Sequence, residues 1–124
     1  MSVKFYICER CGNEITFVKN SGVPVMCCGQ KMKELVPGTV EASLEKHIPE
    51  YTVENNKVSV VVGSVEHPMI EAHYIEWIAL ETKEGVQIKH LKAEMAPKVE
   101  FTLTENDEVV AVYAYCNLHG LWVK

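Results

Sequence analysis

Four of the five cysteines lie between residues 8 and 28, and this cluster restricts the fold of the N-terminal segment more than any other feature. Cys8 and Cys11 form a C-x-x-C pair followed by glycine, and fifteen residues later the adjacent pair Cys27 and Cys28 precedes another glycine. A tight knuckle of this kind aims thiolates and backbone N–H groups at one metal ion. The segment has too few apolar residues to fold on their burial alone, so we expect a bound metal to supply much of its stability.

The cysteine spacing leaves the metal open between iron and zinc. Zinc ribbons, in which four thiolates hold zinc and take no part in chemistry, generally pair two C-x-x-C knuckles. The adjacent Cys27 and Cys28 instead impose wider and less regular sulfur–metal–sulfur angles. Disulfides, Cys8 with Cys11 or Cys27 with Cys28, are the weaker interpretation, because an odd number of cysteines cannot pair completely and we expect a compartment that keeps thiols reduced.

The 124 residues have room for this small module and one further domain of roughly 90 residues. Hydrophobic residues make up 48% of the chain, but no apolar run approaches the ~20 residues of a membrane span. The first residues also lack the long apolar stretch of a secretory signal. We therefore expect a soluble, cytoplasmic protein with no membrane partner.

The net charge of −5 is divided unevenly along the chain. Residues 1–36 carry five basic and three acidic side chains, whereas residues 37–124 carry seven basic and fourteen acidic ones. An acidic body argues against nucleic acid as a partner, because the phosphate backbone must be neutralised by lysine and arginine. The change of sign predicts two domains, 1–36 and 37–124, with the boundary in the segment Leu35-Val36-Pro37-Gly38.

From residue 51 onward, short runs of strand-forming residues alternate with turn sequences such as Asn55-Asn56 and Lys83-Glu84-Gly85. The expected strands of this body are Tyr51–Glu54, Lys57–Val62, Tyr74–Glu81, Val86–His90, Val99–Leu103 and Val109–Tyr115. With no amphipathic helix among them, the pattern predicts an antiparallel β-sandwich of about seven strands, Ig-like in outline. The predicted fold class is thus mainly β, with the small metal-binding module ahead of the sandwich.

A second group of metal-binding side chains is spread over the body. Cys116 stands three residues before His119 in a predicted turn, and His47, His67 and His73 lie in segments that flank the expected strands. A sandwich gathers such segments at one end, so a shared site is geometrically reasonable. Thiolate and imidazole donors suit iron, copper or zinc, and exclude magnesium and calcium, which prefer oxygen.

The residues alone leave the number of histidine ligands open. Two histidines with Cys116 and a weak axial methionine, Met69 or Met95, would make a blue-copper electron carrier. Four histidines with one thiolate exceed the usual four ligands of zinc and suit a five-coordinate iron with one open position. A zinc-stapled binding protein without redox chemistry is the third alternative. His90 has no second donor near it in the sequence and is interpreted as a surface histidine.

The ordered motifs resemble desulfoferrodoxin, the two-iron class of superoxide reductase, from about residue 5 to the C-terminus. The segments that carry the resemblance are Cys8-x-x-Cys11, Cys27-Cys28, Glu45-Lys46-His47-Ile48-Pro49, His67-Pro68-Met69, His73-Tyr74-Ile75-Glu76-Trp77 and Cys116-Asn117-Leu118-His119-Gly120. Several rare spacings recur in the same order. The segment 91–98 contains no motif that tests the resemblance.

This resemblance implies two iron ions per chain. The N-terminal module would be a rubredoxin- or desulforedoxin-like iron centre held by all four of its cysteines, Cys8, Cys11, Cys27 and Cys28. The body would hold a catalytic iron with four equatorial histidines, His47, His67, His73 and His119, and an axial Cys116. The family further implies a homodimer, electrons from rubredoxin or a similar donor, and a role in superoxide detoxification.

The implied reaction is the one-electron reduction of superoxide to hydrogen peroxide, which consumes two protons and releases no dioxygen. Lys46 adjoins His47 and would place positive charge beside the open position, where an acidic body needs local attraction for an anion. Glu45 would occupy the vacant position after oxidation and assist product release. Without the motif around them, both residues would be interpreted as solvated side chains of a loop.

Overall fold

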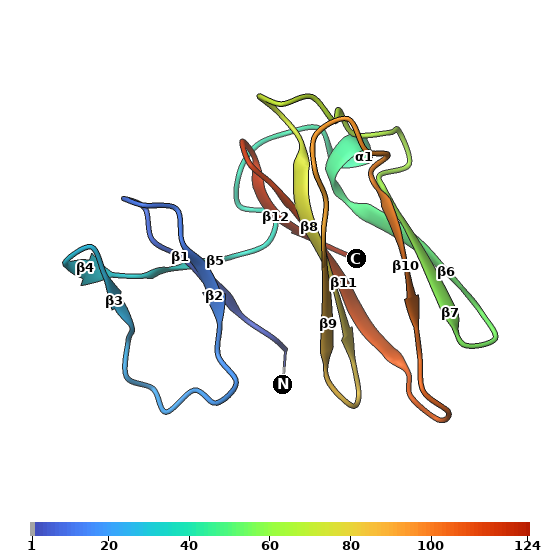
Figure 1. Ribbon diagram of the computed structural model, residues 1–124, viewed down its shortest axis with the longest axis horizontal. Helices are drawn as coiled ribbons and strands as arrows, with labels where there is room; N and C mark the ends of the chain where they lie inside the picture. The colour runs from blue at the N-terminus through green and yellow to red at the C-terminus, as the bar shows by residue number, and fades with distance from the viewer. Residues whose placement is uncertain (1) are drawn as a thin grey trace. The chain divides into compact units, whose positions relative to one another are not determined.

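The computed structural model describes residues 2–124, which divide into two compact units on either side of the boundary between Val36 and Pro37 (Figure 1). The fold is mainly β, as the sequence predicts, with one four-residue helix among the described residues. None of the helical structure in this part of the chain is long and apolar enough to cross a membrane.

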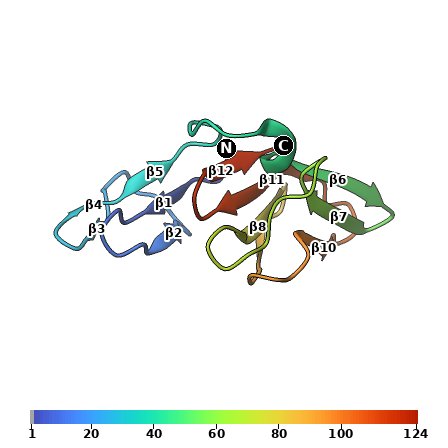
Figure 2. The same cartoon turned by 90° about the horizontal axis from the view of Figure 1, so that it is seen from above.

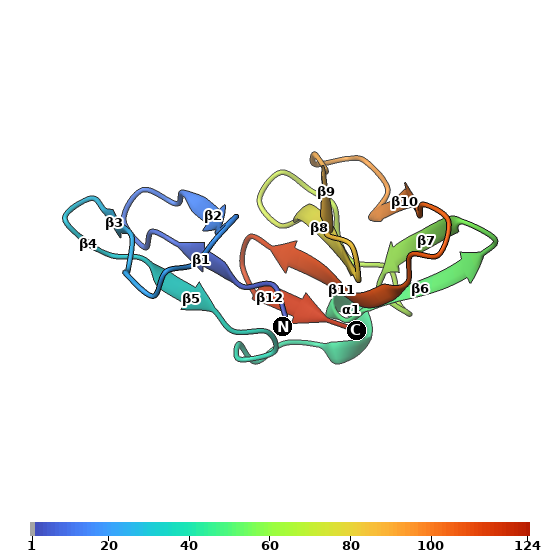
Figure 3. The ribbon, with the colours of Figure 1, turned by 90° about the horizontal axis from the view of Figure 1, so that it is seen from below.

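The first unit is a three-stranded antiparallel sheet with a separate small hairpin. The sheet has the order β2-β1-β5, and the hairpin joins β3 to β4, as Figure 3 shows. The strands are β1 (Phe5–Ile7), β2 (Glu14–Thr16), β3 (Met26–Cys27), β4 (Gln30–Lys31) and β5 (Lys33–Leu35).

The adjacent cysteines are placed by the turn of the β3–β4 hairpin. Cys27 pairs with Gln30, so Cys28 and Gly29 form a two-residue turn. Their φ angles are +52° and +75°, and a turn with two positive φ angles matches the right-handed twist of the strands it joins. Glycine adopts this conformation at no steric cost, whereas Cys28 is a non-glycine residue in the left-handed region. With Cys27 at the end of β3 and Cys28 in the turn, the sulfur atoms of both residues lie within 4.8 Å of those of Cys8 and Cys11.

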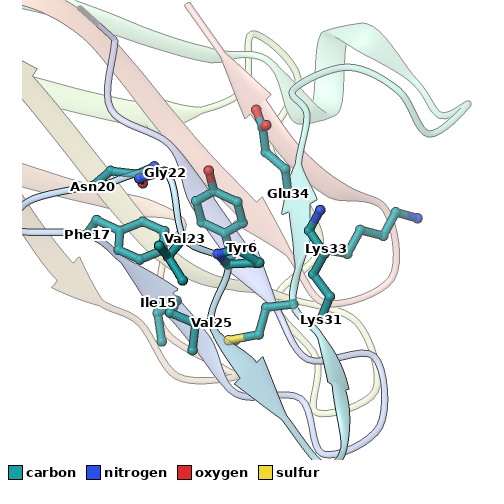
Figure 4. Close-up of a pocket in the computed structure, with 12 residues that line it drawn as sticks. Tyr6, Ile15, Phe17, Asn20, Gly22, Val23, Val25, Lys31, Lys33 and Glu34 are labelled. Atoms are coloured by element: carbon teal, nitrogen blue, oxygen red, sulfur yellow. The ribbon is translucent and has the colours of Figure 1, made fainter.

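A pocket of the first unit lies on the sheet rather than at the cysteines. Figure 4 shows Tyr6, Ile15 and Phe17 around it, with the ring of Phe17 packed edge-on against that of Tyr6 at 5.1 Å. Lys31, Lys33 and Glu34 also line the pocket. None of the described residues that line it is a cysteine or histidine. The pocket is therefore separate from the donor groups that the sequence singles out.

The second unit contains seven strands in two antiparallel sheets, which confirms the predicted count. One sheet has the order β10-β7-β6 and the other β12-β11-β8-β9. Figure 2 shows β6 and β7 side by side, and the hairpin of β11 and β12 is visible in the same view. The elements are α1 (Leu44–His47), β6 (Pro49–Glu54), β7 (Lys57–Val62), β8 (Ile75–Thr82), β9 (Val86–His90), β10 (Lys98–Thr102), β11 (Val109–Cys116) and β12 (Gly120–Val123).

The core lies between these two sheets. Alternate residues of β7, Val58, Val60 and Val62, are buried and meet apolar side chains of β8, β10 and β11. Cys116 belongs to the same buried cluster. Each valine or isoleucine buried in such a core contributes roughly 1.5–3 kcal/mol to folding. The sandwich is therefore a firm scaffold for the segments at its end that carry the histidines.

Candidate metal centres

The four N-terminal cysteines lie together, with sulfur atoms all within 4.8 Å of one another. The C-x-x-C segment closes as a knuckle, because the N–H of Gly12 donates to the carbonyl of Cys8 at 2.9 Å. The Cys11 N–H points at Cys8 Sγ at 3.4 Å, and Asn13 Nδ2 donates to Cys27 Sγ at 3.7 Å. All five cysteines of the chain are free thiols, so the disulfide interpretation is not supported.

Protonation within this four-cysteine group is uneven. The backbone N–H of Cys11 stabilises the Cys8 thiolate and lowers the pKa of Cys8 to about 6. The neighbouring thiol of Cys11 raises the pKa of Cys28 to about 12. The reason is that each thiolate makes ionisation of the next less favourable at such short separations. A cation at the centre removes this repulsion, and thiolate is the form that binds a metal.

The second group comprises His47, His67, His73 and Cys116, whose donor atoms lie within 4.8 Å of one another. His119 adjoins them, because its Nδ1 is 3.2 Å from His47 Nε2 and 3.8 Å from Cys116 Sγ. The structure thus brings together all five side chains that the sequence singled out in the body. All five were expected in loops, but two of them lie at the ends of secondary-structure elements. His47 is the last residue of α1, and Cys116 is the last residue of β11.

Two of the imidazoles have their tautomer set by the backbone. His47 Nδ1 is 2.7 Å from the carbonyl of Ser43, and His67 Nδ1 is 2.6 Å from the carbonyl of Pro68. A carbonyl oxygen only accepts, so the proton of each ring is on Nδ1 and Nε2 carries a lone pair. Burial lowers the pKa of both rings, to about 4 for His67, and so favours the neutral form.

These two lone pairs face each other, since His47 Nε2 and His67 Nε2 are only 3.1 Å apart. Neither nitrogen has a proton to share, and two acceptors at this distance repel unless a cation lies between them. His73 adds a third donor, because its Nε2 is buried and has no hydrogen-bond partner within residues 2–124. A buried nitrogen of this kind costs about 1–3 kcal/mol if it stays unpaired. The donor set therefore fits a bound metal ion.

Cys116 completes this group from the core side. Its side chain is fully buried, and burial raises the pKa of its thiol above the usual value. A thiol in such surroundings stays protonated unless a cation compensates the thiolate charge. Three nitrogens and one sulfur of this kind form a soft donor set that suits iron, copper or zinc.

Glu45 and Lys46 lie on α1, immediately before His47. The pKa of Glu45 is lowered by hydrogen bonding to its own backbone N–H, so its carboxylate stays ionised. Lys46 is half-buried, and its charge acts on the rings of His47 and His73. Lys46 is therefore close to the group of donor atoms, and Glu45 precedes it on the same helical turn.

The methionines of the copper alternative are engaged elsewhere. Met69 Sδ accepts the backbone N–H of Ile75, and Met95 Sδ accepts that of Lys92, each at 3.3 Å. Met95 is also 45% exposed. His90 lies exposed at the end of β9, in agreement with its interpretation as a surface histidine. These placements favour the histidine-rich set over a set with an axial methionine.

Two supporting residues were not identified from the sequence. The Asn117 side chain accepts the N–H of Tyr74 at 2.9 Å and donates to the carbonyl of Ala72 at 3.1 Å. Trp122 Nε1 donates to the carbonyl of His119 at 3.0 Å, and the Trp122 ring lies 5.1 Å from that of His47. Asn117 stands within the Cys116–His119 motif, but its partners are 43 and 45 residues away and no sequence signal identifies them.

The absence of a side chain at Gly63 allows the segment that carries His47 to pack closely against it. A Cβ at this position would lie 2.7 Å from the carbonyl oxygens of both Glu45 and Ile48. These are backbone atoms and cannot rotate away, so we expect Gly63→Ala to lower the free energy of unfolding by about 3 kcal/mol, the upper end of the usual cost of overpacking. The same clash should displace His47 and weaken metal binding by the body. Urea unfolding and metal titration measure the two effects.

Gly85 provides the matched control. A Cβ added there meets nothing within 4 Å, and the residue lies in the turn between β8 and β9. Gly85→Ala should therefore change the free energy of unfolding by no more than about 0.5 kcal/mol. Equal free energies of unfolding for the two alanine variants would contradict the prediction, because they would show that the backbone around α1 can move to accommodate a Cβ at Gly63.

Comparison with known proteins shows which family has a similar sequence. Residues 39–124 match the family model described as Desulfoferrodoxin. The chain is 45% identical to a desulfoferrodoxin homolog of Archaeoglobus fulgidus, covering 97% of this chain and 94% of the relative. It is 44% identical to a desulfoferrodoxin of Nitratidesulfovibrio vulgaris, covering 96% of this chain and 93% of the relative.

A solved structure agrees with these relatives. The superoxide reductase from Treponema pallidum superposes with a TM-score of 0.85 at 39% identity, covering 100% of this chain and 99% of that one. The four-cysteine group and the group of three histidines and one cysteine are consistent with the two iron sites of desulfoferrodoxin. The family model, the relatives and the solved structure therefore agree, and the chain belongs to the desulfoferrodoxin family.

Proposed function

We propose that this protein is a superoxide reductase whose body binds the catalytic iron through His47, His67, His73, His119 and Cys116. The observation that carries the proposal is the convergence of unprotonated nitrogens, above all the 3.1 Å approach of His47 Nε2 to His67 Nε2. Iron held by these side chains would supply the electron that, with two protons, converts superoxide to hydrogen peroxide without release of dioxygen. The names of relatives such as the Treponema pallidum enzyme support the same activity.

The nitrogen atoms that would bind the metal follow from the hydrogen bonds. His47 and His67 would use Nε2, because their Nδ1 atoms face carbonyl oxygens. His73 would also use Nε2, the buried atom without a partner, whereas His119 would use Nδ1, which faces both His47 and Cys116. The Ser43 and Pro68 carbonyls would hold two rings in orientation and raise their basicity as ligands.

Lys46 and Glu45 would act on substrate and product. The ammonium group of Lys46 would attract superoxide to a body whose net charge is negative, and would stabilise negative charge that develops on the oxygen atoms. The ionised carboxylate of Glu45 would act as a further iron-binding group that assists the release of product. The proximity of both side chains to His47 on α1 supports these roles.

The N-terminal module would hold the second iron through Cys8, Cys11, Cys27 and Cys28. Electrons would come from a small redox donor of the rubredoxin type, and the protein would act as a homodimer in the cytoplasm. These assignments rest on the family resemblance. The blue-copper alternative is not retained, because the sulfurs of Met69 and Met95 already accept backbone N–H groups.

Metal analysis combined with an activity assay tests the proposal. We expect two iron ions per chain in protein purified from an iron-rich culture, and consumption of superoxide with formation of hydrogen peroxide but no dioxygen. An oxygen electrode distinguishes this result from dismutation, which releases dioxygen. Copper in the body, or a colourless zinc protein that leaves superoxide untouched, would contradict the proposal.

A further inference from the structure

The five donor residues of the body come from distant segments, and their side chains are held in different ways. The rings of His47 and His67 are each fixed by a hydrogen bond from Nδ1 to a carbonyl. His119 and Cys116 share one short hairpin, in which Cys116 pairs with Gly120. His73 lies six residues after His67 in the same connection between β7 and β8, and among the described residues its ring nitrogen Nε2 has no hydrogen-bond partner.

The loop of His73 is held through its backbone. Ile70 and His73 exchange two N–H to carbonyl hydrogen bonds of 3.0 Å each, which closes the loop on itself. This bridge sets the shape of the loop but does not fix it relative to the other donor residues. The pairing of β8 with β11, which places Ile75 opposite Cys116, brings the end of the loop near the other donors. Asn117, in the turn between Cys116 and His119, extends this connection to His73 itself.

The Asn117 side chain forms hydrogen bonds with the backbone on both sides of His73. Its Oδ1 accepts the N–H of Tyr74 at 2.9 Å, and its Nδ2 donates to the carbonyl of Ala72 at 3.1 Å. The backbone N–H of Asn117 adds a third bond, to the carbonyl of Tyr74 at 3.2 Å. An amide is suited to this position because it offers a donor and an acceptor in one plane.

We propose that Asn117 is a positioning residue that locks His73 to the Cys116–His119 turn, so that donors from separate loops form one metal site. The inference rests on the ligand set of the proposed function. Asn117 would not touch the metal or the substrate. It would fix the distance between His73 Nε2 and Cys116 Sγ, since the two peptide groups it holds immediately flank His73.

Cobalt titration of the full chain tests the inference without any assay of superoxide. Bound Co²⁺ absorbs through its thiolate ligands, and subtracting the spectrum of the same chain carrying Cys116→Ser removes the contribution of the four-cysteine group. We expect Asn117→Ala to weaken Co²⁺ binding at the body site by about 10- to 100-fold, the usual effect of losing a residue that orients a ligand. The Cys116-dependent band should also shift. Asn56→Ala, in the exposed turn between β6 and β7, is the matched control. It should leave the Co²⁺ affinity of the body site and the Cys116-dependent band unchanged.

A double-mutant cycle distinguishes the positioning of His73 from a general loss of structure at the metal site. If Asn117 acts through His73, then Asn117→Ala has little further effect on Co²⁺ affinity once His73→Ala is present. Additive losses, or a parent-like affinity in Asn117→Ala, would overturn the inference. Asn117→Ser enters the same cycle if the alanine variant does not fold. A parent chain with no Cys116-dependent band would overturn the proposed ligand set itself, whereas a normal parent band with an additive cycle would overturn only the role of Asn117.

Discussion

Replacing Cys116 by serine is expected to lower the rate of superoxide reduction by more than about 100-fold, because loss of a residue that merely orients a ligand already costs 10- to 100-fold. The thiol is fully buried within the core cluster and is the single sulfur donor of the body group. Serine has nearly the same shape, so the substitution removes the soft donor with little change in packing. Stopped-flow measurement of superoxide decay gives the rate.

The N-terminal centre provides the internal control for Cys116→Ser. Its four sulfurs lie in the first unit, so its visible absorption should persist in the variant. Cys11→Ser is the matched substitution, because it removes an exposed thiol from the other group. It should alter the absorption of the N-terminal centre and leave the metal site of the body intact. Substantial superoxide reduction by Cys116→Ser at full iron content would be incompatible with the proposed role of the thiolate.

Removal of metal from the N-terminal module is expected to unfold that module while the body stays folded. The buried hydrophobic residues of the described segment 2–36 are Phe5, Cys8 and Met32, and its apolar Val18 and Val23 are exposed. Segments shorter than about 40 residues usually need a metal, disulfides or a partner to fold. Binding of a structural metal contributes about 10–16 kcal/mol in small zinc modules, which exceeds what so small a core supplies.

Hydrogen exchange of the full chain measures this effect. After treatment with a strong chelator, or in the variant with Cys11→Ser and Cys28→Ser, amides of β1 and β5 should exchange rapidly. Amides of β8 and β11, which cross the hydrophobic core of the body, should remain protected in both. Slow exchange of β1 and β5 in metal-free protein would mean that the first unit folds without its metal.

Most of the strands of the body could be predicted because their turns have clear sequence signals. The Asn55-Asn56 pair separates β6 from β7, and Lys83-Glu84-Gly85 separates β8 from β9, as expected. β12 was not among the expected strands, because its residues Gly120–Val123 do not alternate between apolar and polar side chains. The helix α1 is a single turn and is too short to have a detectable period.

The sequence by itself determined the chemistry of the donors: four clustered thiols, and a set of histidines with one further cysteine in a β-rich body. Only the tertiary structure decided which donors meet and through which atoms. His47 and His119 are 72 residues apart, yet their nitrogens approach to 3.2 Å, and carbonyls of Ser43 and Pro68 select the tautomers of two rings. Metal binding depends on such distances, which are set by the path of the backbone through the sandwich rather than by the spacing of residues along the chain.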